Sequence, residues 1–466
     1  MTTRYKNIEQ IAGRSILLIM VCIMLFAPAC KKYLDKKPIK SAVIPTTLND
    51  LQGLLDNSNV LNIYSPAAMS ELVADNYYLT TDDWKSEYDF DTEAPLNYIW
   101  DKDVLSLTNF NSWGQAYQNA IYYSNIVLDQ LPLVNVNADE AEKYRNIKGS
   151  ALFFRAFIFQ SLAQVYCKPY STDNANDLGI VLKLTSNVSE KVTRATIQQT
   201  YDRIIADLKE ATDLLPVTTL YPTRPSKTAA YAALARTFLS MRDYTNAGMY
   251  ANLALQQYNV LMDYNTLIPV GNPVINYFNP EVIFHSVTST PYVLGYLAKI
   301  DSILYQSYDI NDLRKIIFFN DNGDNTYSFR GSYYGLSSTS IFDGLTTDEL
   351  YLIRAESYAR AGNTASAMAD LNLLLQKRWK TGSFTDMTAT DAADALNKIL
   401  AERRKELIYR GLRWSDVRRF NLEGANIVLK RVVDNVTYTL PPNDLRIALL
   451  IPFNEINRSG ITQNPR

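Results

Sequence analysis

The residues best suited to catalysis in this chain are two glutamates one helical turn apart, Glu402 and Glu406. Two carboxyl groups about 5–10 Å apart can hydrolyse a glycosidic bond, and residues spaced i, i+4 share a helix face. Four cations lie within the same stretch: Arg403, Arg404, Lys405 and Arg413. Neighbouring cations lower the pKa of a carboxyl group, whereas a general acid needs a raised pKa. We therefore predict an ion-pair network that ties this helix to the following turn, with a surface hydrolase as the alternative.

The other reactive side chains give little support to catalysis or metal binding. His285 is the only histidine, which excludes multi-histidine metal sites and disfavours histidine-based triads, and its apolar neighbours predict a structural role. Asn320–Asn325 has part of a calcium-loop pattern without the bidentate glutamate, so we predict a hairpin turn at Asn322-Gly323. Cys22 and Cys30 lie in the first thirty residues, which leaves Cys167 without a partner. We predict no enzymatic activity, no cofactor and no metal.

Aromatic side chains are the residues whose chemistry indicates binding. The chain has 32 Tyr, 17 Phe and 5 Trp, and its net charge of −2 offers nucleic acid no electrostatic attraction. A tyrosine presents a flat apolar face and a hydroxyl group at low entropic cost, which suits the C–H faces and hydroxyl groups of sugars. We expect most rings to fill the core and a minority to face a ligand. The rings predicted to bind ligand are Trp84, Tyr98, Trp100, Tyr292, Tyr296 and Tyr333.

These rings lie in two irregular segments between helical ones. Residues 60–110 are rich in aromatic residues, and residues 263–346 combine frequent Pro and Gly with short β-like runs. Long loops in a compact protein are commonly functional, so both segments are predicted to face the ligand. The helical scaffold is predicted over residues 105–260 and 347–420. Its helices outside the repeats described next are expected at Ser112–Leu131, Ile147–Tyr166, Ile197–Leu215 and Asp391–Arg410.

Two helix pairs keep the small-residue spacing of a tetratricopeptide repeat. The first pair carries Ala235, Phe238, Ala247, Ala251 and Ala254, and the second carries Ala355, Tyr358, Ala367, Leu371 and Leu374. Gly362 is placed to cap the first helix of the second pair. Helix pairs of this kind cannot bury their faces alone. We therefore predict a mainly α fold, a tetratricopeptide-like right-handed helical array with loop-rich, partly β insertions.

The first thirty residues predict export. Basic residues precede the apolar run Ile16–Phe26, and Ala27-Pro28-Ala29 supplies a small-residue cleavage site. The apolar run is too short for a membrane span, so residues 1–29 are predicted to be a signal peptide. Cys30 follows the cleavage site directly and is predicted to carry a lipid anchor such as palmitate. Ordinary A-x-A cleavage without lipidation is the alternative.

Five groups of residues, spread over nearly the whole chain, resemble the motifs of one family. They are Cys30–Asp35 with Pro38, Lys148–Ala151 with Arg155-Ala156-Phe157, Glu349–Glu356 with Leu371-Asn372, Glu402–Leu407 with Gly411–Val417, and Ile451-Pro452 with Asn454–Ile456 and Thr462–Pro465. The family is SusD/RagB, the surface nutrient-binding lipoproteins of Bacteroidota.

This resemblance implies an outer-membrane lipoprotein that binds oligosaccharides or polysaccharide at the cell surface and delivers them to a TonB-dependent, SusC-like transporter. It implies one SusD-like domain over residues 30–466. Family members bind ligands through aromatic platforms in variable loops, so the shared motifs transfer no ligand-binding residues. A peptide- or glycoprotein-binding uptake lipoprotein on the same scaffold is the alternative.

Overall fold

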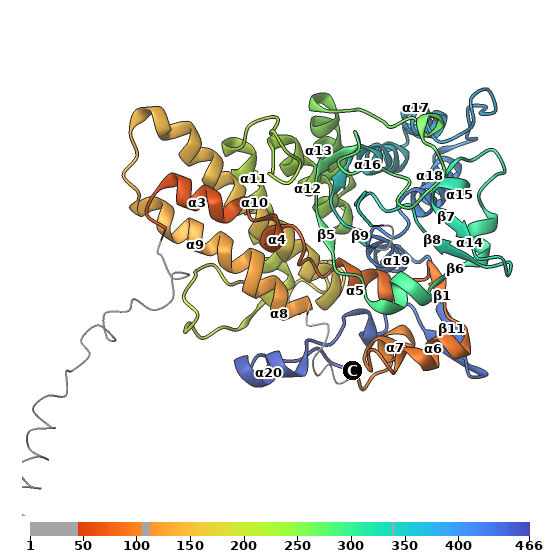
Figure 1. The fold of residues 1–466 in the computed structure, drawn as a ribbon, viewed down its shortest axis with the longest axis horizontal. Helices are drawn as coiled ribbons and strands as arrows, with labels where there is room; N and C mark the ends of the chain where they lie inside the picture. Colours follow the sequence, from red (N-terminus) through yellow and green to blue (C-terminus); the bar gives the residue numbers. More distant parts are fainter. Residues whose placement is uncertain (1–44, 105–111, 338–339) are drawn as a thin grey trace, which may run out of the picture. The chain divides into compact units, whose positions relative to one another are not determined.

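The computed structural model describes residues 45–104, 112–337 and 340–466 (Figure 1). Thr46–Arg466 forms one compact unit, and the fold below is that of this unit. The predicted signal peptide and Cys30 lie outside the described residues. In the part of the chain that is described, no helix has the length and apolar character that crossing a membrane requires.

The centre of the fold is a tetratricopeptide-like array. Helices α12 (Lys227–Ser240) and α13 (Tyr244–Gln257) form the first predicted pair, and α16 (Thr347–Arg360) and α17 (Thr364–Gln376) form the second. Helix α13 packs against α16, which joins the two pairs across the intervening insertion (Figure 1). Ala247, Ala251 and Ala254 are fully buried at these contacts, because small side chains let the helices approach closely. The predicted mainly α, tetratricopeptide-like fold is confirmed.

The array continues toward the N-terminus through longer helices. Helix α10 (Ala141–Tyr166) packs against α11 (Ile197–Leu214), and α11 packs against α12. Thr196 and Gln199 form a capping box at the start of α11, which fixes where this helix begins. The segment predicted as one helix over Ser112–Leu131 is interrupted: α8 (Ser112–Ala116) and α9 (Tyr122–Gln130) flank the π-helical turn η1 (Tyr117–Ile121).

Shorter helices complete the unit. They are α3 (Leu48–Leu55), α4 (Ser58–Leu61), α5 (Ala67–Leu72), α6 (Thr81–Glu87), α7 (Ala94–Tyr98), α14 (Ser302–Gln306), α15 (Arg314–Ile317), α18 (Ala392–Glu406), α19 (Arg413–Leu422) and α20 (Phe453–Ser459), with the 3-10 turns η2 (Leu131–Leu133), η3 (Ala138–Glu140), η4 (Tyr264–Thr266) and η6 (Leu445–Ile447) and the π-helical turn η5 (Val293–Leu297). Helix α18 ends four residues before the predicted Arg410, because Tyr409 and Gly411 both adopt positive φ angles in the following turn.

The described strands form two-stranded antiparallel ladders. They pair β1 (Tyr77–Tyr78) with β6 (Lys299–Ile300), β2 (Leu178–Val181) with β3 (Arg194–Thr196), β4 (Val282–Phe284) with β10 (Leu345–Thr346), β5 (Val287–Thr288) with β9 (Ile341–Phe342), β7 (Phe319–Asp321) with β8 (Tyr327–Phe329), and β11 (Leu429–Val433) with β12 (Val436–Leu440). Most of them lie in or beside the two irregular segments. The β7–β8 hairpin turns at Asn322-Gly323, which confirms the hairpin predicted there instead of a calcium loop.

Buried ion pairs hold the scaffold together at the motif residues. Arg155 Nε lies 2.8 Å from Asp207 Oδ2 and joins α10 to α11. Arg236 Nη2 lies 2.6 Å from Glu349 Oε2 and joins α12 to α16. Glu356 Oε1 accepts from Arg419 Nη1 at 2.5 Å. Buried charges require such partners, so these motif residues maintain the fold and are not free for a ligand.

His285 has the structural role predicted for it, and Cys167 is unpaired, as predicted. His285 is buried between β4 and β5 among the rings of Tyr277, Phe278, Tyr334 and Phe342. Burial lowers the pKa of this imidazole to about 4, so it is neutral at physiological pH. Cys167 is a buried free thiol, and burial raises its pKa to about 11.

Candidate ligand-binding surface

Glu402 and Glu406 are the centre of a buried ion-pair network. Arg314 donates to both, with Nη2 2.6 Å from Glu402 Oε2 and Nη1 2.9 Å from Glu406 Oε2. Arg378 Nε donates to the other oxygen of Glu406 at 2.7 Å. Arg403 reaches across the following turn to Asp416 in the first turn of α19 at 2.9 Å. The predicted ion-pair network is confirmed, and both glutamates face guanidinium groups instead of a cleft.

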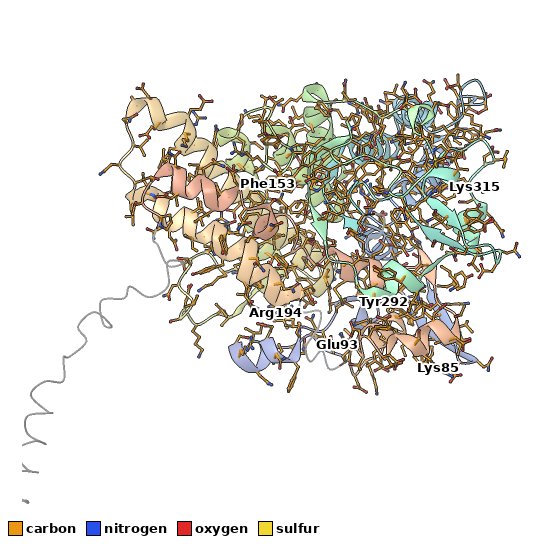
Figure 2. The ribbon with its side chains drawn as sticks, viewed as in Figure 1. Lys85, Glu93, Phe153, Arg194, Tyr292 and Lys315 are labelled. Carbon is orange, nitrogen blue, oxygen red and sulfur yellow. The ribbon has the colours of Figure 1, made fainter. Side chains whose placement is uncertain are left out.

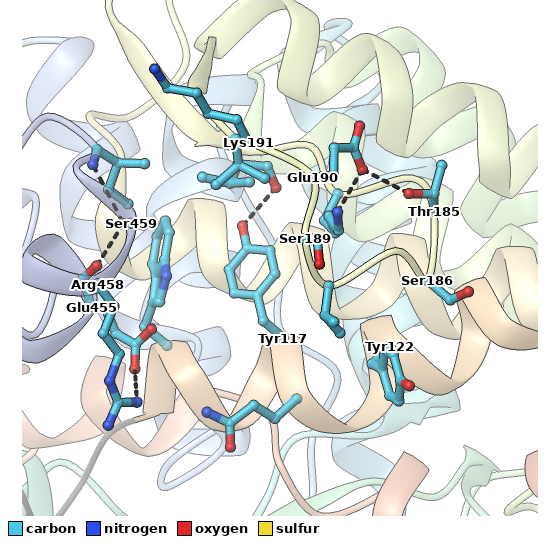
Figure 3. A pocket seen from close by; sticks show the side chains of 17 residues that line it. Tyr117, Tyr122, Thr185, Ser186, Ser189, Glu190, Lys191, Glu455, Arg458 and Ser459 are labelled. Carbon is cyan, nitrogen blue, oxygen red and sulfur yellow. Dashed lines mark hydrogen bonds and ion pairs between the residues drawn. The ribbon is translucent and has the colours of Figure 1, made fainter. Parts of the chain in front are cut away.

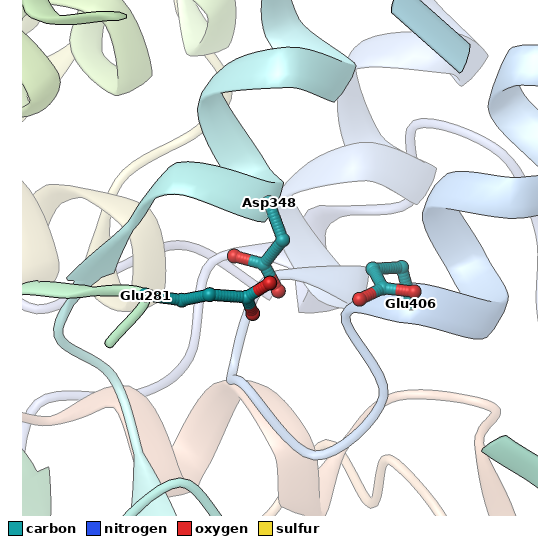
Figure 4. A group of neighbouring side chains, drawn as sticks. All are labelled: Glu281, Asp348 and Glu406. Carbon is teal, nitrogen blue, oxygen red and sulfur yellow. The ribbon is translucent and has the colours of Figure 1, made fainter. Parts of the chain in front are cut away.

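Glu281, Asp348 and Glu406 form a buried acidic cluster beside this network (Figure 4). Their carboxylate oxygens lie within 4.8 Å of one another. The cluster already holds cations: Arg378 Nη2 lies 2.7 Å from Glu281 Oε1, and Arg410 Nη1 lies 3.7 Å from Asp348 Oδ2. Burial raises the pKa of Glu281 to about 7, and Arg378 partly offsets this shift. Because the three carboxylates are buried and already lie close to guanidinium groups, we assign the cluster to the core.

Tyr98 and Trp100, two of the rings predicted to bind ligand, are buried. Their polar atoms are used internally, because the Tyr98 hydroxyl accepts from the Leu79 amide and the Trp100 indole donates to the Val73 carbonyl. The guanidinium group of Arg431 lies over both rings, 4.4 Å from the Tyr98 centroid and 5.2 Å from the Trp100 centroid. Cation–π contacts with a buried arginine hold these rings in the core. The expectation that they face a ligand therefore does not hold in this structure.

Tyr333 is also buried, and Trp84 is half-buried. The Tyr333 hydroxyl donates to Glu281 Oε2 at 2.5 Å, and Arg410 lies 4.5 Å above its ring, so Tyr333 serves the acidic cluster. The Trp84 indole donates to the Pro95 carbonyl at 3.0 Å and packs edge-on against Tyr88. The placement of Tyr333 is again a correction to the sequence prediction, while Trp84 keeps part of its ring at the surface.

Tyr292 and Tyr296, the other two predicted rings, lie together at the surface with Phe90. Tyr292 stacks on Phe90 at 4.1 Å between centroids and on Tyr296 at 4.9 Å, with interplanar angles of 22° and 27°. The exposed fractions are 55% for Phe90, 37% for Tyr292 and 72% for Tyr296. We call these three residues the ring platform. Because Tyr292 has a ring on each side, the faces left for a ligand are the outer ones of Phe90 and Tyr296.

Backbone pairing between the two irregular segments positions the ring platform. Strand β1 pairs with β6, which brings the segment that carries Phe90 beside the segment that carries Tyr292 and Tyr296. Lys299 in β6 pairs with Asp83 in α6 at 2.6 Å. The π-helical turn η5 begins directly after Tyr292 and contains Tyr296, and residues four apart lie one turn from each other. Figure 2 labels Tyr292 on the side of the unit that also carries Glu93.

Carboxyl groups flank the ring platform. Asp89 and Asp91 lie next to Phe90 in the sequence, and Asp89 is exposed. Glu87 is buried at the end of α6. Burial and the neighbouring Asp91 raise the pKa of Glu87 to about 7, while the Val293 amide partly offsets the shift. Carboxylates accept hydrogen bonds from hydroxyl groups and repel anions, so the acidic residues beside the platform suit a neutral, hydroxyl-rich ligand.

A groove of about 760 Å³ lies beside the helix formed by α8, η1 and α9 (Figure 3). Tyr117 and Tyr122 lie on its floor beside the buried Trp113, residues 181–192 form the facing wall, and α20 closes one end. We call this feature the α8–α20 groove. The Tyr117 hydroxyl donates to the Val181 carbonyl at 2.7 Å and so joins the floor to the wall.

Sequence reasoning missed Phe90 and the α8–α20 groove. Phe90 lies between two acidic residues, Asp89 and Asp91, shortly after a short helix, and an apolar ring in such a setting is a signal for a surface role. Trp113 and Tyr117, four residues apart, did indicate a helix face, but they fit a core stripe equally well. The π-helical turn that follows them has no sequence signal that we can identify.

Two family matches fit this scaffold. Residues 32–239 match a SusD-like family described as "Starch-binding associating with outer membrane", and residues 348–465 match the SusD family. The two matches cover most of the chain without overlap. The chain belongs to the SusD/RagB family. SusD-like protein P2 of Formosa agariphila is 23% identical over 378 residues, which cover 66% of this chain and 71% of that relative.

Solved structures show the same fold. A SusD superfamily protein from Bacteroides thetaiotaomicron is 21% identical with a TM-score of 0.72, covering 90% of this chain and 100% of its own. A SusD-like carbohydrate binding protein from Bacteroides vulgatus is 19% identical with a TM-score of 0.65, covering 89% and 97%. These structures share the fold of this chain, and the ring platform lies in its irregular segments.

Proposed function

We propose that this SusD/RagB protein is a cell-surface lipoprotein that binds oligosaccharides or polysaccharide and delivers them to a TonB-dependent, SusC-like outer-membrane transporter. In this proposal, residues 1–29 are a signal peptide, Cys30 is the lipid anchor, and residues 30–466 form one SusD-like domain. The family description, which names starch binding and the outer membrane, supports both parts. The B. vulgatus structure described as a carbohydrate binding protein supports the ligand class.

The observation that carries the proposal is the ring platform. Stacked rings with two free outer faces fit the apolar faces of sugar rings, and flanking carboxylates fit sugar hydroxyl groups. The Tyr292 and Tyr296 hydroxyl groups make no hydrogen bond to any described residue, so they are available to a ligand. The protein is proposed to bind without catalysis, because the carboxyl pair suited to hydrolysis is engaged by Arg314 and Arg378.

A binding panel tests the ligand class. Residues 31–466 would be titrated with neutral polysaccharides (an α-glucan, a β-glucan, a mannan and a xylan), with an acidic polysaccharide, and with a peptide mixture. We expect a neutral glycan to bind and the acidic one to bind more weakly. Peptide binding without glycan binding would favour the alternative, a peptide- or glycoprotein-binding uptake lipoprotein. A chain that binds neither glycan nor glycoconjugate would refute the proposal.

Membrane attachment and delivery have separate tests. Mass spectrometry of the mature N-terminus should find acyl chains on Cys30, and Cys30→Ala should release the chain from the outer membrane. Affinity purification of the lipidated chain should recover a TonB-dependent transporter. An unmodified Cys30 would leave the binding role standing and remove the anchor from it.

A further inference from the structure

We propose that the α8–α20 groove is a second saccharide subsite, filled by the same glycan chain that stacks on the ring platform. This inference rests on the proposed glycan-binding function and adds the length of the ligand that the protein is built to hold. The inference rests on the rings of the groove floor, on the hydrogen-bonding groups of the facing wall, and on the narrow pocket whose residues adjoin both the groove and the platform.

The floor of the groove presents aromatic rings because of the π-helical turn. Trp113 and Tyr117 are four residues apart, with ring centroids 5.2 Å apart. In a regular helix the next residue in this row would be Ile121, which is fully buried. The π-helical turn adds a residue to that helical turn, so Tyr122 lines the groove instead. Such turns frequently occur at functional sites. This one leaves Ile121 in the core and places the Tyr122 ring at the cavity.

The facing wall mixes valine side chains with polar groups, and two of its charges form an ion pair. Lys183 pairs with Glu190 at 2.5 Å, and Thr185 donates to the same carboxylate at 2.7 Å. At the end of the groove, Arg458 lies 3.8 Å from Glu455. Lys191 adds a positive charge to these two pairs, and the polar groups together offer donors and acceptors to hydroxyl groups.

Several polar groups in the groove have no protein partner. The Tyr122 hydroxyl, the Ser189 hydroxyl and the Lys191 ammonium make no hydrogen bond to another described residue. The Tyr117 and Tyr122 rings form the apolar floor of the groove, and these polar groups supply donors and acceptors around it. This pattern suits a pyranose, which has apolar C–H faces and hydroxyl groups at its edge. The volume of about 760 Å³ lies within the ~300–1,000 Å³ range of ligand pockets, so the groove holds a short stretch of a chain.

A narrow pocket is lined by residues that adjoin both the groove and the ring platform in the sequence. Asp91 and Pro291, the neighbours of Phe90 and Tyr292, line a narrow pocket together with Pro452. Pro452 caps α20, whose residues close the end of the groove. In this proposal, a glycan that extends from the platform reaches the groove past residues 450–455. Two subsites on one chain raise the apparent affinity for a long ligand, because the second contact becomes intramolecular.

Ligand length separates this inference from the proposed function. The full chain, purified in detergent, would be titrated with soluble starch, a β-glucan, a mannan and a xylan, and with short and long oligosaccharides of the polymer that binds. The groove variants are Tyr122→Ala, which removes the ring, and Ser189→Trp, which fills the cavity from an exposed position. Their matched controls are Tyr221→Ala, an exposed ring, and Ala365→Trp, an exposed position on α17. Thermal unfolding confirms that each variant is folded.

We expect both groove variants to weaken binding of the polymer about tenfold or more and to leave binding of the shortest oligosaccharide unchanged. The controls should bind like the parent chain. Groove variants that bind the polymer normally, while Tyr296→Ala does not, would overturn the second subsite and leave the proposed function intact. Equal losses for short and long ligands would also overturn it. If the parent chain binds no glycan, both proposals fall together.

Discussion

Phe90 and Tyr292 stack with their ring centroids 4.1 Å apart, although the helices from α7 to α13, which include the first repeat-like pair, separate them in the sequence. A stacked pair contributes about 0.5–1.5 kcal/mol beyond the area that it buries. That energy is modest, so the stack is better suited to presenting rings than to holding the unit together. The predictions below separate residues that present a surface from residues that maintain the scaffold.

Tyr296→Ala is expected to reduce glycan affinity about tenfold or more without changing the melting temperature. The side chain is 72% exposed, so its removal should change the free energy of unfolding little. The same side chain provides one of the two ring faces of the platform that are open to a ligand. Isothermal titration with the best glycan and a thermal melt would measure the two effects. Tyr221→Ala, a ring that is 53% exposed elsewhere, is the control and should bind normally. Equal binding by both variants would remove Tyr296 from the site.

Glu406→Gln is expected to destabilise the protein by about 3–5 kcal/mol, because it leaves Arg314 and Arg378 buried without their shared partner. The free energy of unfolding in denaturant measures this effect. Glu142→Gln on the exposed side of α10 is the matched control, with an expected change within about 0.5 kcal/mol. A stable Glu406→Gln variant that had lost a glycan-cleaving activity of the parent chain would instead support a hydrolase.

Gly149→Ala is expected to destabilise the fold by about 1–3 kcal/mol through overpacking between α10 and α11. A Cβ at this position would lie 2.9 Å from Leu214 Cβ and 2.9 Å from Leu215 Cγ. Gly53→Ala in α3 is the opposite case, since a Cβ there meets nothing within 4 Å. That variant should gain about 0.5–1 kcal/mol from helix propensity. Chemical denaturation of both variants gives the comparison, and equal changes would argue against the close helix contact.

Glu87 is expected to make the stability of the protein fall as pH rises. Its folded-state pKa is about 7, above the ordinary value of 4.5, so the folded chain holds the proton more tightly. The resulting stabilisation is complete below pH 4.5 and is lost as pH rises to about 7. Glu87→Gln removes this contribution, so the free energy of unfolding should decline less between pH 5 and pH 8, about the window in which the carboxyl ionises.

The free energy of unfolding of Glu87→Gln should still fall in part as pH rises. Burial also raises the pKa values of Glu71 and Glu281 to about 7, and these groups act in the same direction. A variant with the same pH profile as the parent chain would show that Glu87 ionises normally. Denaturant melts at closely spaced pH values measure the profile.

The helical scaffold was predictable because its signals are local. Small residues at repeat spacing fixed both helix pairs, and Gly362 marked a helix end with a positive φ of 78°. The role of Glu402 and Glu406 was predictable from adjacent charges, although their main partners, Arg314 and Arg378, lie far away in the sequence.

The binding surface was predictable only in part, because ring exposure depends on distant partners. Tyr98 and Trp100 are buried by Arg431, which β11 supplies from the other end of the chain. Tyr333 is buried by Glu281 and Arg410. Tyr292 and Tyr296, four residues apart, come together through a local turn, but Phe90 joins them through strand pairing that no local pattern shows.

To transfer ligand preference between related proteins, two segments of the sequence should have to be exchanged together. Strands β1 and β6 are joined through backbone atoms, so the pairing tolerates different side chains on either strand. A chimera that imports only the segment after β1 would place foreign rings opposite the native Tyr292. Importing the stretch before β6 as well would transfer the complete ring stack. The helical array would stay unchanged, so the two segments would act as one exchangeable unit.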